Sequence, residues 1–174
     1  MGDEVWYATI VGVIVLSGLS IFYILYLAKM RRTKTNAAWK QAATELGLDF
    51  TPVTRMFGKY RMSGVIGKQL SCSVWAYTEP NGQGGYTTFM NYDVRFFQPL
   101  NKVKELLTPN IQSKLLEVNN VLKKVVVSDD SINSTRVSGF IRKSEILIQN
   151  VKLLIQLAEL IIPNEEVDSI FEEI

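Results

Sequence analysis

The sequence predicts an α+β protein in which one N-terminal transmembrane helix is followed by an antiparallel sheet packed with helices. Three patterns lead to this class: an uncharged apolar run near the N-terminus, four strand-like segments in the middle, and apolar helical segments after residue 100. The 174 residues leave room for one domain beside the anchor. We assign 1–30 to an extracytoplasmic N-terminus and anchor, 31–47 to a basic collar and amphipathic helix, 48–162 to a cytoplasmic α+β domain, and 163–174 to an acidic tail helix.

The anchor is the uncharged run 6–28, which as a helix measures about 35 Å and can cross a bilayer core of about 30 Å. Its acidic start at Asp3 and Glu4 differs from the basic start of a cleaved signal peptide. Lys and Arg follow the run and none precedes it, which predicts an inner-membrane protein with its N-terminus outside and its domain in the cytoplasm. The expected interfacial anchors are Trp6, Tyr7, Tyr23, Tyr26, Lys29, Arg31 and Arg32.

Small residues inside the anchor indicate a surface on which another transmembrane helix can pack closely. We therefore expect other transmembrane subunits and membrane lipids as partners, and we leave open whether pigments or lipids bind along the span. The alternative is that transmembrane helices are simply richer in glycine than soluble ones. The candidate packing residues are Ala8, Gly12, Ser17, Gly18 and Ser20.

A second helical stripe follows the basic collar and ends at Gly47. Because no proline or glycine lies between Ala28 and Gly47, the anchor can continue into this stripe as one long helix. The stripe has apolar residues at i, i+3, i+4 and i+7, namely Trp39, Ala42, Ala43 and Leu46.

Four strands are expected at 48–53, 59–64, 69–78 and 86–98. A tight turn at Gly67-Lys68 and a longer glycine-containing loop at 79–85 connect the later ones. Alternation predicts a core face and a wet face. The core face receives Leu70, Cys72, Val74, Ala76, Met90, Tyr92, Val94 and Phe96, and the wet face receives Ser71, Ser73, Trp75, Tyr77, Asn91, Asp93 and Arg95.

The C-terminal half predicts helices around one hairpin. A short helical segment is expected around Val103, Leu106 and Leu107, and Thr108 followed by Pro109 predicts an N-cap and the first residue of the next helix. A hairpin with strands at 122–127 and 133–141 turns at 128–131, and the last long helix begins with Ser144 as N-cap and ends before Pro163.

The last long helix has a single polar stripe and is otherwise apolar, so it should be covered on more than one side. The protein's own sheet and first helix are one possible cover, and a partner protein is the other. The stripe consists of Glu145, Gln149, Lys152, Gln156 and Glu159.

The tail predicts an acidic amphipathic helix without a basic residue. Anionic lipid would repel it, so its apolar face is expected to contact protein, either a partner or its own domain. The candidate docking residues are Val167, Ile170, Phe171 and Ile174.

The order of these parts resembles a set of uncharacterised prokaryotic membrane-anchored proteins. They share a Trp-x-x-x-Ala-x-x-x-Gly-Leu helix, a Gly-x-Tyr-x-Met-x-Gly strand, a glycine-containing hairpin and a closing apolar helix. The resemblance spans most of 37–162 and implies a fold, but no known activity and no catalytic residue. The matching positions are Trp39, Ala43, Gly47, Leu48, Gly58, Tyr60, Met62, Gly64, Gly67, Gly82–Gly85, Leu157, Ala158 and Leu160.

Composition removes much of the usual catalytic chemistry. The chain has no histidine and one cysteine, which excludes Ser-His-Asp and Cys-His pairs, histidine metal sites and a thiolate zinc site. Cys72 is interpreted as a small core residue and not as a nucleophile. The segment around Gly67-Lys68 departs from a phosphate-binding loop, and the net charge of +2 gives no indication of nucleic acid. We expect no catalytic residue, no cofactor and no metal.

Carboxylates remain as candidate acids, bases or cation ligands. We interpret Asp93 as a solvated residue of the wet face, and Asp129-Asp130 as turn residues. Glu79 is likewise expected to be solvated. The glycosylation pattern Asn133-Ser134-Thr135 is coincidental if the domain is cytoplasmic.

These observations predict a non-catalytic accessory or scaffold subunit of a larger membrane protein complex, with respiratory and photosynthetic complexes to be examined first. The alternative is a membrane-tethered ligand-binding or sensory domain. An enzyme using carboxylates alone is the third class, and it would need a deep pocket where Asp93 and Glu79 converge. The candidate ligand face of the alternative consists of Trp75, Tyr77, Phe89 and Phe97.

Overall fold

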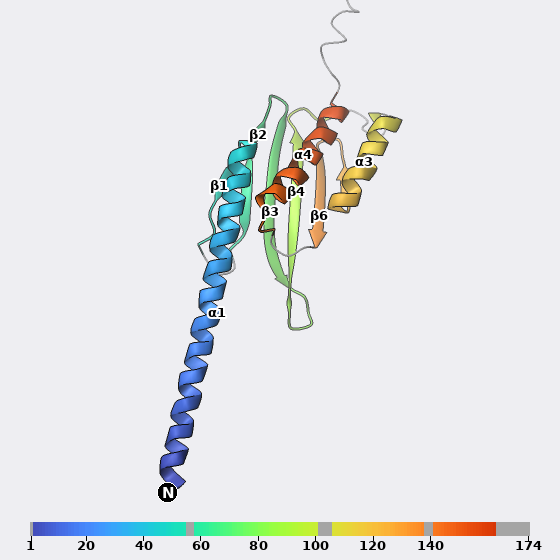
Figure 1. Ribbon diagram of the computed structural model, residues 1–174. Coiled ribbons are helices and arrows are strands. Elements are labelled where there is room, and N and C mark those ends of the chain that lie inside the picture. Colours follow the sequence, from blue (N-terminus) through green and yellow to red (C-terminus); the bar gives the residue numbers. More distant parts are fainter. Residues whose placement is uncertain (1, 55–57, 101–105, 138–140, 163–174) are drawn as a thin grey trace, which may run out of the picture.

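The computed structural model describes residues 2–54, 58–100, 106–137 and 141–162. A six-stranded antiparallel sheet with strand order β1-β2-β3-β4-β6-β5 packs with helices behind a long N-terminal helix (Figure 1). This confirms the predicted α+β class. The elements in chain order are α1 (Gly2–Leu46), β1 (Asp49–Thr51), β2 (Tyr60–Ile66), β3 (Leu70–Pro80), β4 (Tyr86–Phe96), α3 (Pro109–Leu122), β5 (Val125–Val127), β6 (Ser131–Val137) and α4 (Ser144–Ile161).

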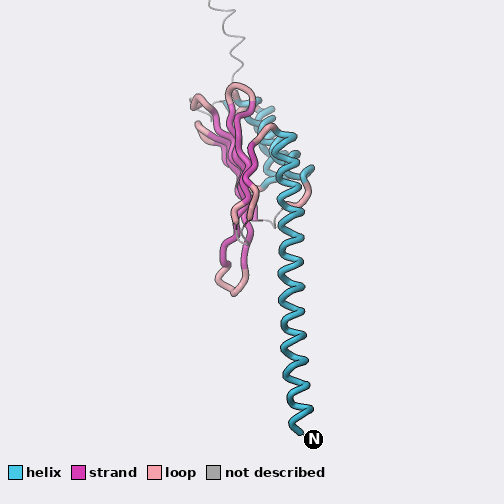
Figure 2. The backbone as a smooth tube through the Cα atoms, turned by 90° about the vertical axis from the view of Figure 1, so that its left-hand side faces the viewer, coloured by secondary structure: helices cyan, strands magenta, loops and turns pink. Residues whose placement is uncertain are grey.

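The sheet and the helices form two layers. Seen from the side, the described helices lie together on one side of the sheet (Figure 2). The core fills the space between the layers, because apolar residues of β2, β3, β4 and β6 alternate toward the helices. Fully buried members include Trp39 from α1, Val74 and Met90 from the sheet, and Leu154 from α4. The predicted core alternation of the third and fourth strands is therefore confirmed.

Helix α1 is one uninterrupted helix of 45 residues, about 67 Å long. Its first half leaves the domain and is uncovered, since the large apolar side chains described between Trp6 and Tyr26 are 38% to 70% exposed. This part is long and apolar enough to cross a membrane. Its most apolar stretch has a mean hydropathy of 2.4, and none of the residues in that stretch is buried by the rest of the protein. The second half carries the predicted apolar stripe into the domain core. The prediction that anchor and stripe form one helix is confirmed.

Polar side chains of α1 attach it to the domain. The Asn36 side chain donates to the Val53 carbonyl (3.0 Å) and accepts from the Val53 amide (3.1 Å). Arg32 donates to the Thr54 carbonyl (2.7 Å), and the Trp39 indole donates to the Ile141 carbonyl (3.2 Å). These hydrogen bonds join α1 to the segment that follows β1 and to the segment that precedes α4.

The end of α1 fits tightly against the sheet. Gly47 has φ of +67° and Leu48 donates to the Ala43 carbonyl (2.8 Å), which closes the helix with a left-handed residue. Leu48 then passes over Gly64 in β2, where an added Cβ would lie 3.1 Å from Leu48 Cδ2 and 3.3 Å from its Cα. The geometry therefore gives a structural reason for the glycine at each of positions 47 and 64.

Both predicted turns between strands are present. Gly67 (φ +62°) lies in the turn joining β2 to β3. The β3–β4 hairpin has Gly82 and Gly84 at positive φ, and the Asn81 side chain accepts from the Gly85 amide (2.9 Å). This hairpin extends beyond the rest of the sheet toward the N-terminal half of α1 (Figures 1 and 2).

The C-terminal half follows the prediction with shifted boundaries. Thr108 caps α3 and Pro109 begins it, as predicted. Leu122 was expected to open a strand but is the last residue of α3, because Lys123 and Lys124 adopt positive φ and turn the chain before β5. Strand β6 begins at Ser131 and not at 133. Ser144 is the buried first residue of α4, whose N-cap is Lys143 without a side-chain bond, so the predicted Ser144 cap is wrong.

Helix α4 is covered by the protein itself. It packs against α1, α3 and β4, which supplies the first of the two predicted kinds of cover. Its predicted polar stripe is exposed, whereas Asn150 on its core side is buried and donates to the Tyr92 hydroxyl (2.9 Å). The expected Val103 lies outside the described residues, as do the candidate docking residues of the tail.

Candidate functional site

The sheet has a second face, opposite the helices, which no described helix covers (Figure 2). We call it the open face. Strand register assigns its side chains, because residues paired across strands point to the same side. Its members are Asp49, Thr51, Arg61, Ser63, Val65, Ser71, Ser73, Trp75, Tyr77, Glu79, Thr87, Phe89, Asn91, Asp93, Arg95, Val126, Ser131, Asn133, Thr135 and Val137.

Aromatic side chains gather at one end of the open face. Tyr77 and Phe89 are paired across β3 and β4, and their rings stack with centroids 5.4 Å apart and an interplanar angle of 22°. Trp75 lies two residues along β3 on the same face, and the Lys59 ammonium is 5.8 Å from the Tyr77 ring centroid. All three rings are partly exposed. We call Trp75, Tyr77 and Phe89 the aromatic cluster.

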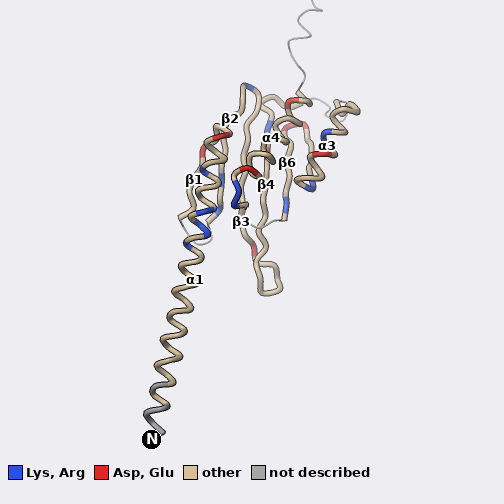
Figure 3. The backbone as a smooth tube through the Cα atoms, viewed as in Figure 1, with Lys and Arg blue, Asp and Glu red and all other residues tan. Residues whose placement is uncertain are grey.

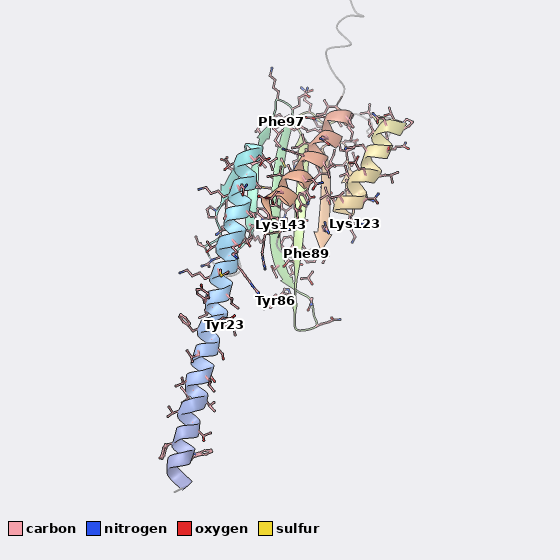
Figure 4. The ribbon with its side chains drawn as sticks, in the orientation of Figure 1. Tyr23, Tyr86, Phe89, Phe97, Lys123 and Lys143 are labelled. Atoms are coloured by element: carbon pink, nitrogen blue, oxygen red, sulfur yellow. The ribbon has the colours of Figure 1, made fainter. Side chains whose placement is uncertain are left out.

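Phe97 does not belong to this cluster. Its amide donates to the Gln69 carbonyl (2.9 Å) beside the β2–β3 turn, and its side chain is 52% exposed. Gln69 is six residues from Trp75 along the sequence, which in a strand is about 20 Å. Figure 4 places Phe97 and Phe89 toward opposite ends of the domain. The four residues of the predicted ligand face are thus divided between two places.

A polar pair formed by a buried amide and an exposed hydroxyl lies beside the aromatic cluster. Asn91 is paired with Trp75 on one side and with Thr135 on the other, and the Thr135 hydroxyl donates to Asn91 Oδ1 (2.7 Å). Asn91 is only 7% exposed, and its Nδ2 has no hydrogen-bond partner among the described residues. A buried donor without a partner is unfavourable, and because this nitrogen is closed to solvent, an acceptor from outside could bind it only after neighbouring side chains move.

Asp93 is also buried, at 7% exposure, and pairs with Arg95 through a 2.8 Å contact between Oδ2 and Nε. The expectation that Asn91 and Asp93 are solvated was therefore wrong. The face was assigned correctly, but β4 lies in the middle of the sheet and neighbouring strands flank it on both sides. Ser73 and Asn133 stand opposite Asp93 and remove its access to water.

The predicted carboxylates do not converge. Glu79 is exposed on β3 opposite Thr87, six residues from Ser73, so it lies about 20 Å along the sheet from Asp93. Asp130 is part of the β5–β6 turn, as predicted, where the hydroxyls of Ser128 (2.7 Å) and Ser131 (3.1 Å) bind it and lower its pKa. Among the described residues, the separation of about 20 Å keeps Asp93 and Glu79 from sharing one pocket.

Cys72 lies on the core face of β3 and is 2% exposed. Burial, and secondarily the charge of Asp93, raise the pKa of its thiol to about 12, so it carries a proton at neutral pH. The prediction that it is a core residue is confirmed. In the described part of the chain, His, Cys, Asp and Glu form no group of three that could hold a metal ion.

Within the span, the candidate packing residues Gly12, Ser17, Gly18 and Ser20 are exposed. An added Cβ at Gly12 or Gly18 would meet no atom within 4 Å, and the Ser20 hydroxyl donates to the Leu16 carbonyl (2.8 Å). The interfacial candidates Trp6, Tyr7, Tyr23 and Tyr26 are exposed as well, at 56% to 68%. These side chains are thus free of the domain and accessible from outside it.

Sequence reasoning missed the most polar features of the site. The pair Asn91–Thr135 and the buried pair Asn150–Tyr92 join residues 44 and 58 positions apart, so only the strand register or helix packing brings them together. A signal existed for Asn150, because it interrupts the apolar side of an otherwise regular helix. Comparison of the chain with protein-family models, curated proteins and solved structures gives no match.

Proposed function

We propose that the chain is a single-pass membrane protein without catalytic activity that holds its domain at the cytoplasmic surface and presents the open face to a protein subunit of a larger membrane complex. One observation carries this proposal: described helices cover only one face of the sheet, and the other carries the aromatic cluster beside a buried amide without a partner. Aromatic side chains are enriched in protein interfaces and contribute much of their binding energy.

The anchor is supported by the contrast within α1. A core helix of a soluble protein is buried along its length, but here the apolar half is uncovered while the other half packs in the core. The basic residues that follow the apolar half support the cytoplasmic placement of the domain.

A protein partner suits the shape and chemistry of the open face. Its polar and aromatic side chains lie on one extended surface, and its acidic groups are engaged or distant, since Asp93 pairs with Arg95 and Glu79 lies about 20 Å away. The buried thiol of Cys72 points away from this face. A reaction would require several such groups to meet at one point.

The second candidate is a ligand-binding or sensory domain that uses the same face. The unpaired Nδ2 of Asn91 favours it, because a small molecule with one acceptor atom could bind this donor while its body contacts Trp75.

The test is purification of the intact protein from its membrane in mild detergent, followed by sizing and identification of co-purifying subunits. We expect the double variant Trp75→Ala/Tyr77→Ala to lose the partner. The matched control is Phe97→Ala, which removes an exposed aromatic ring from the other end of the domain and should keep the partner. Wild-type protein that migrates as a lone monomer would contradict the proposal.

Two further arms separate the alternatives. Deletion of residues 164–174 should release the partner only if the tail, and not the open face, makes the contact. If wild-type protein is monomeric and a low-molecular-weight cytosolic extract changes its tryptophan fluorescence, but not that of the Trp75→Ala/Tyr77→Ala variant, the ligand-binding alternative holds.

A further inference from the structure

We infer that the end of the domain facing the apolar span lies on the membrane surface, with the β3–β4 hairpin in the lipid headgroup layer and the basic side chains of α1 that follow the span, Lys29, Arg31 and Arg32, bound to anionic headgroups. This inference rests on the proposed membrane anchor, and it goes beyond it by adding a second, separate contact with lipid.

The β3–β4 hairpin extends toward the apolar half of α1. It runs alongside α1 toward the N-terminus in both views, and Figure 4 places Tyr86 near the level of Tyr23. Tyr23 precedes the first basic residue, Lys29, by six residues, or about 9 Å of helix. The headgroup layer on each side of a bilayer is only about 5–8 Å thick. If 6–28 cross the membrane, the tip of this hairpin therefore reaches the headgroup layer.

The composition of the hairpin suits the membrane interface. Residues 80–88 carry no charge, and Tyr86 exposes 66% of its surface. Tyrosine prefers the membrane interface, where its ring contacts apolar groups and its hydroxyl remains hydrated. The loop also satisfies part of its own backbone, because Asn81 Oδ1 accepts from the amides of Gln83 (3.1 Å) and Gly85 (2.9 Å). Entry into the interface thus costs little desolvation.

Basic side chains gather at this end of the domain. Figure 3 shows Lys and Arg on α1 and at the neighbouring ends of α3, α4 and β6, and Figure 4 places Lys123 and Lys143 at one level. Arg32 of α1 and Arg142 before α4 both lie close enough to Tyr60 to lower its pKa against the larger, raising effect of burial. The described acids at this end are Glu79 and Glu145. Clustered basic side chains next to a span bind anionic lipid.

Contacts between α1 and the domain hold the hairpin at a fixed position relative to α1. The Asn36 and Arg32 contacts fix the segment before β2 to α1, and Trp39 fixes the segment before α4. The hairpin continues strands β3 and β4, of which β3 is paired with β2 along the full length of β2 and β4 is paired with β6. Insertion of the anchor therefore sets the height of the hairpin above the bilayer.

The test uses the full chain in vesicles of phosphatidylcholine and phosphatidylglycerol. Single cysteines are introduced at Gln83→Cys in the hairpin, Lys68→Cys in the opposite β2–β3 turn, and Ser17→Cys in the span, and each is labelled with bimane. The native Cys72 is buried and remains unlabelled in the folded protein. Quenching by lipid with a nitroxide on the headgroup then reports contact with the surface.

We expect headgroup nitroxide to quench the label at 83 and not the label at 68, and nitroxide deep in the acyl chain to quench the label at 17. If 17 is quenched but 83 behaves like 68, or is shielded from both lipid and aqueous iodide, the inference is overturned and the anchor stands. If 17 itself is not quenched, the anchor fails and the inference with it.

Discussion

At the residue scale, the buried hydrogen bond between Asn150 and Tyr92 is the clearest polar requirement of the core. It joins α4 to β4, and both residues are almost fully buried. Neither group can find water if the other is removed, so the bond contributes to stability mainly through the cost of breaking it.

We predict that Asn150→Ala lowers the free energy of unfolding by about 1–3 kcal/mol, because it leaves the Tyr92 hydroxyl buried without a donor. The control is Gln149→Ala, an exposed neighbour on the same helix, whose effect should stay within about 0.5 kcal/mol. Chemical denaturation in detergent, followed by circular dichroism, measures both. Equal effects of the two variants would show that the bond is not required.

Two buried acids predict how stability depends on pH. Burial raises the pKa of Cys72 from 9.0 to about 12 and that of Tyr92 from 10.0 to about 12. Between the lower and the higher pKa, the unfolded chain has lost a proton that the folded chain keeps, so stability falls as pH rises. The protein should be fully stable below about pH 9 and should lose on the order of 1 kcal/mol per pH unit per group above it.

Thermal unfolding between pH 7 and pH 11 measures this decline. In Cys72→Ala the decline should begin near pH 10 instead of pH 9, because Tyr92 and Tyr60, whose pKa values burial raises from 10.0, then remain. A midpoint that stays constant up to pH 11 would contradict the prediction.

Sequence patterns assigned residues to faces correctly but did not assign their exposure. Alternation placed Asn91 and Asp93 on the open face, yet both are buried by neighbouring strands. Periodicity describes the direction of a side chain relative to its own strand, whereas exposure depends on which strands lie beside it. The order of strands is a tertiary property that no local pattern contains.

At the element scale, the fit of the α1 end against β2 depends on a glycine. Leu48 lies directly over Gly64, with no space for a larger side chain. We predict that Gly64→Val destabilises the protein by about 1–3 kcal/mol through overpacking. Ser63→Val, the neighbouring position on the open face, should have a much smaller effect. Denaturant midpoints compare the two, and a neutral Gly64→Val would mean that Leu48 can move.

Helices and strands were predictable where their patterns were long, and boundaries failed where patterns met. The run from Leu122 to Val127 is apolar apart from Lys123 and Lys124, so it suited a strand along its whole length. The structure divides it, since both lysines adopt positive φ and Leu122 belongs to α3. Lysine rarely adopts positive φ, so the sequence gives no indication of this turn, whereas Gly47 at the end of α1 is a residue type that commonly does.

At the scale of the whole molecule, the second half of α1 belongs to the domain core. Trp39 is fully buried and its ring lies 5.5 Å from that of Tyr60. We predict that a chain starting at Lys29 folds without the span, whereas a chain starting at Leu48 does not. Circular dichroism and thermal unfolding of the two soluble chains test this. Cooperative unfolding of the shorter chain would contradict the prediction.

The one-sided arrangement was only partly predictable at this scale. The over-apolar α4 indicated cover from more than one side, and α1, α3 and β4 provide it. The division of the ligand face was not predictable, because Phe97 matched the alternation of β4 but lies beyond its last residue, next to Gln69. Phe97 is separated from Trp75 by distance along the strand, and grouping aromatic residues by the face they share does not take that distance into account.

The unbroken course of α1 also sets a direction around its axis. Each residue of a straight helix turns by about 100°, so the 27 residues from Gly12 to Trp39 amount to seven and a half turns. Gly12 therefore points to the side opposite Trp39. Any neighbouring helix that approaches at Gly12 must stand on the far side of α1 from the domain, and inserting a single residue between them would rotate that neighbour by more than a quarter of a circle.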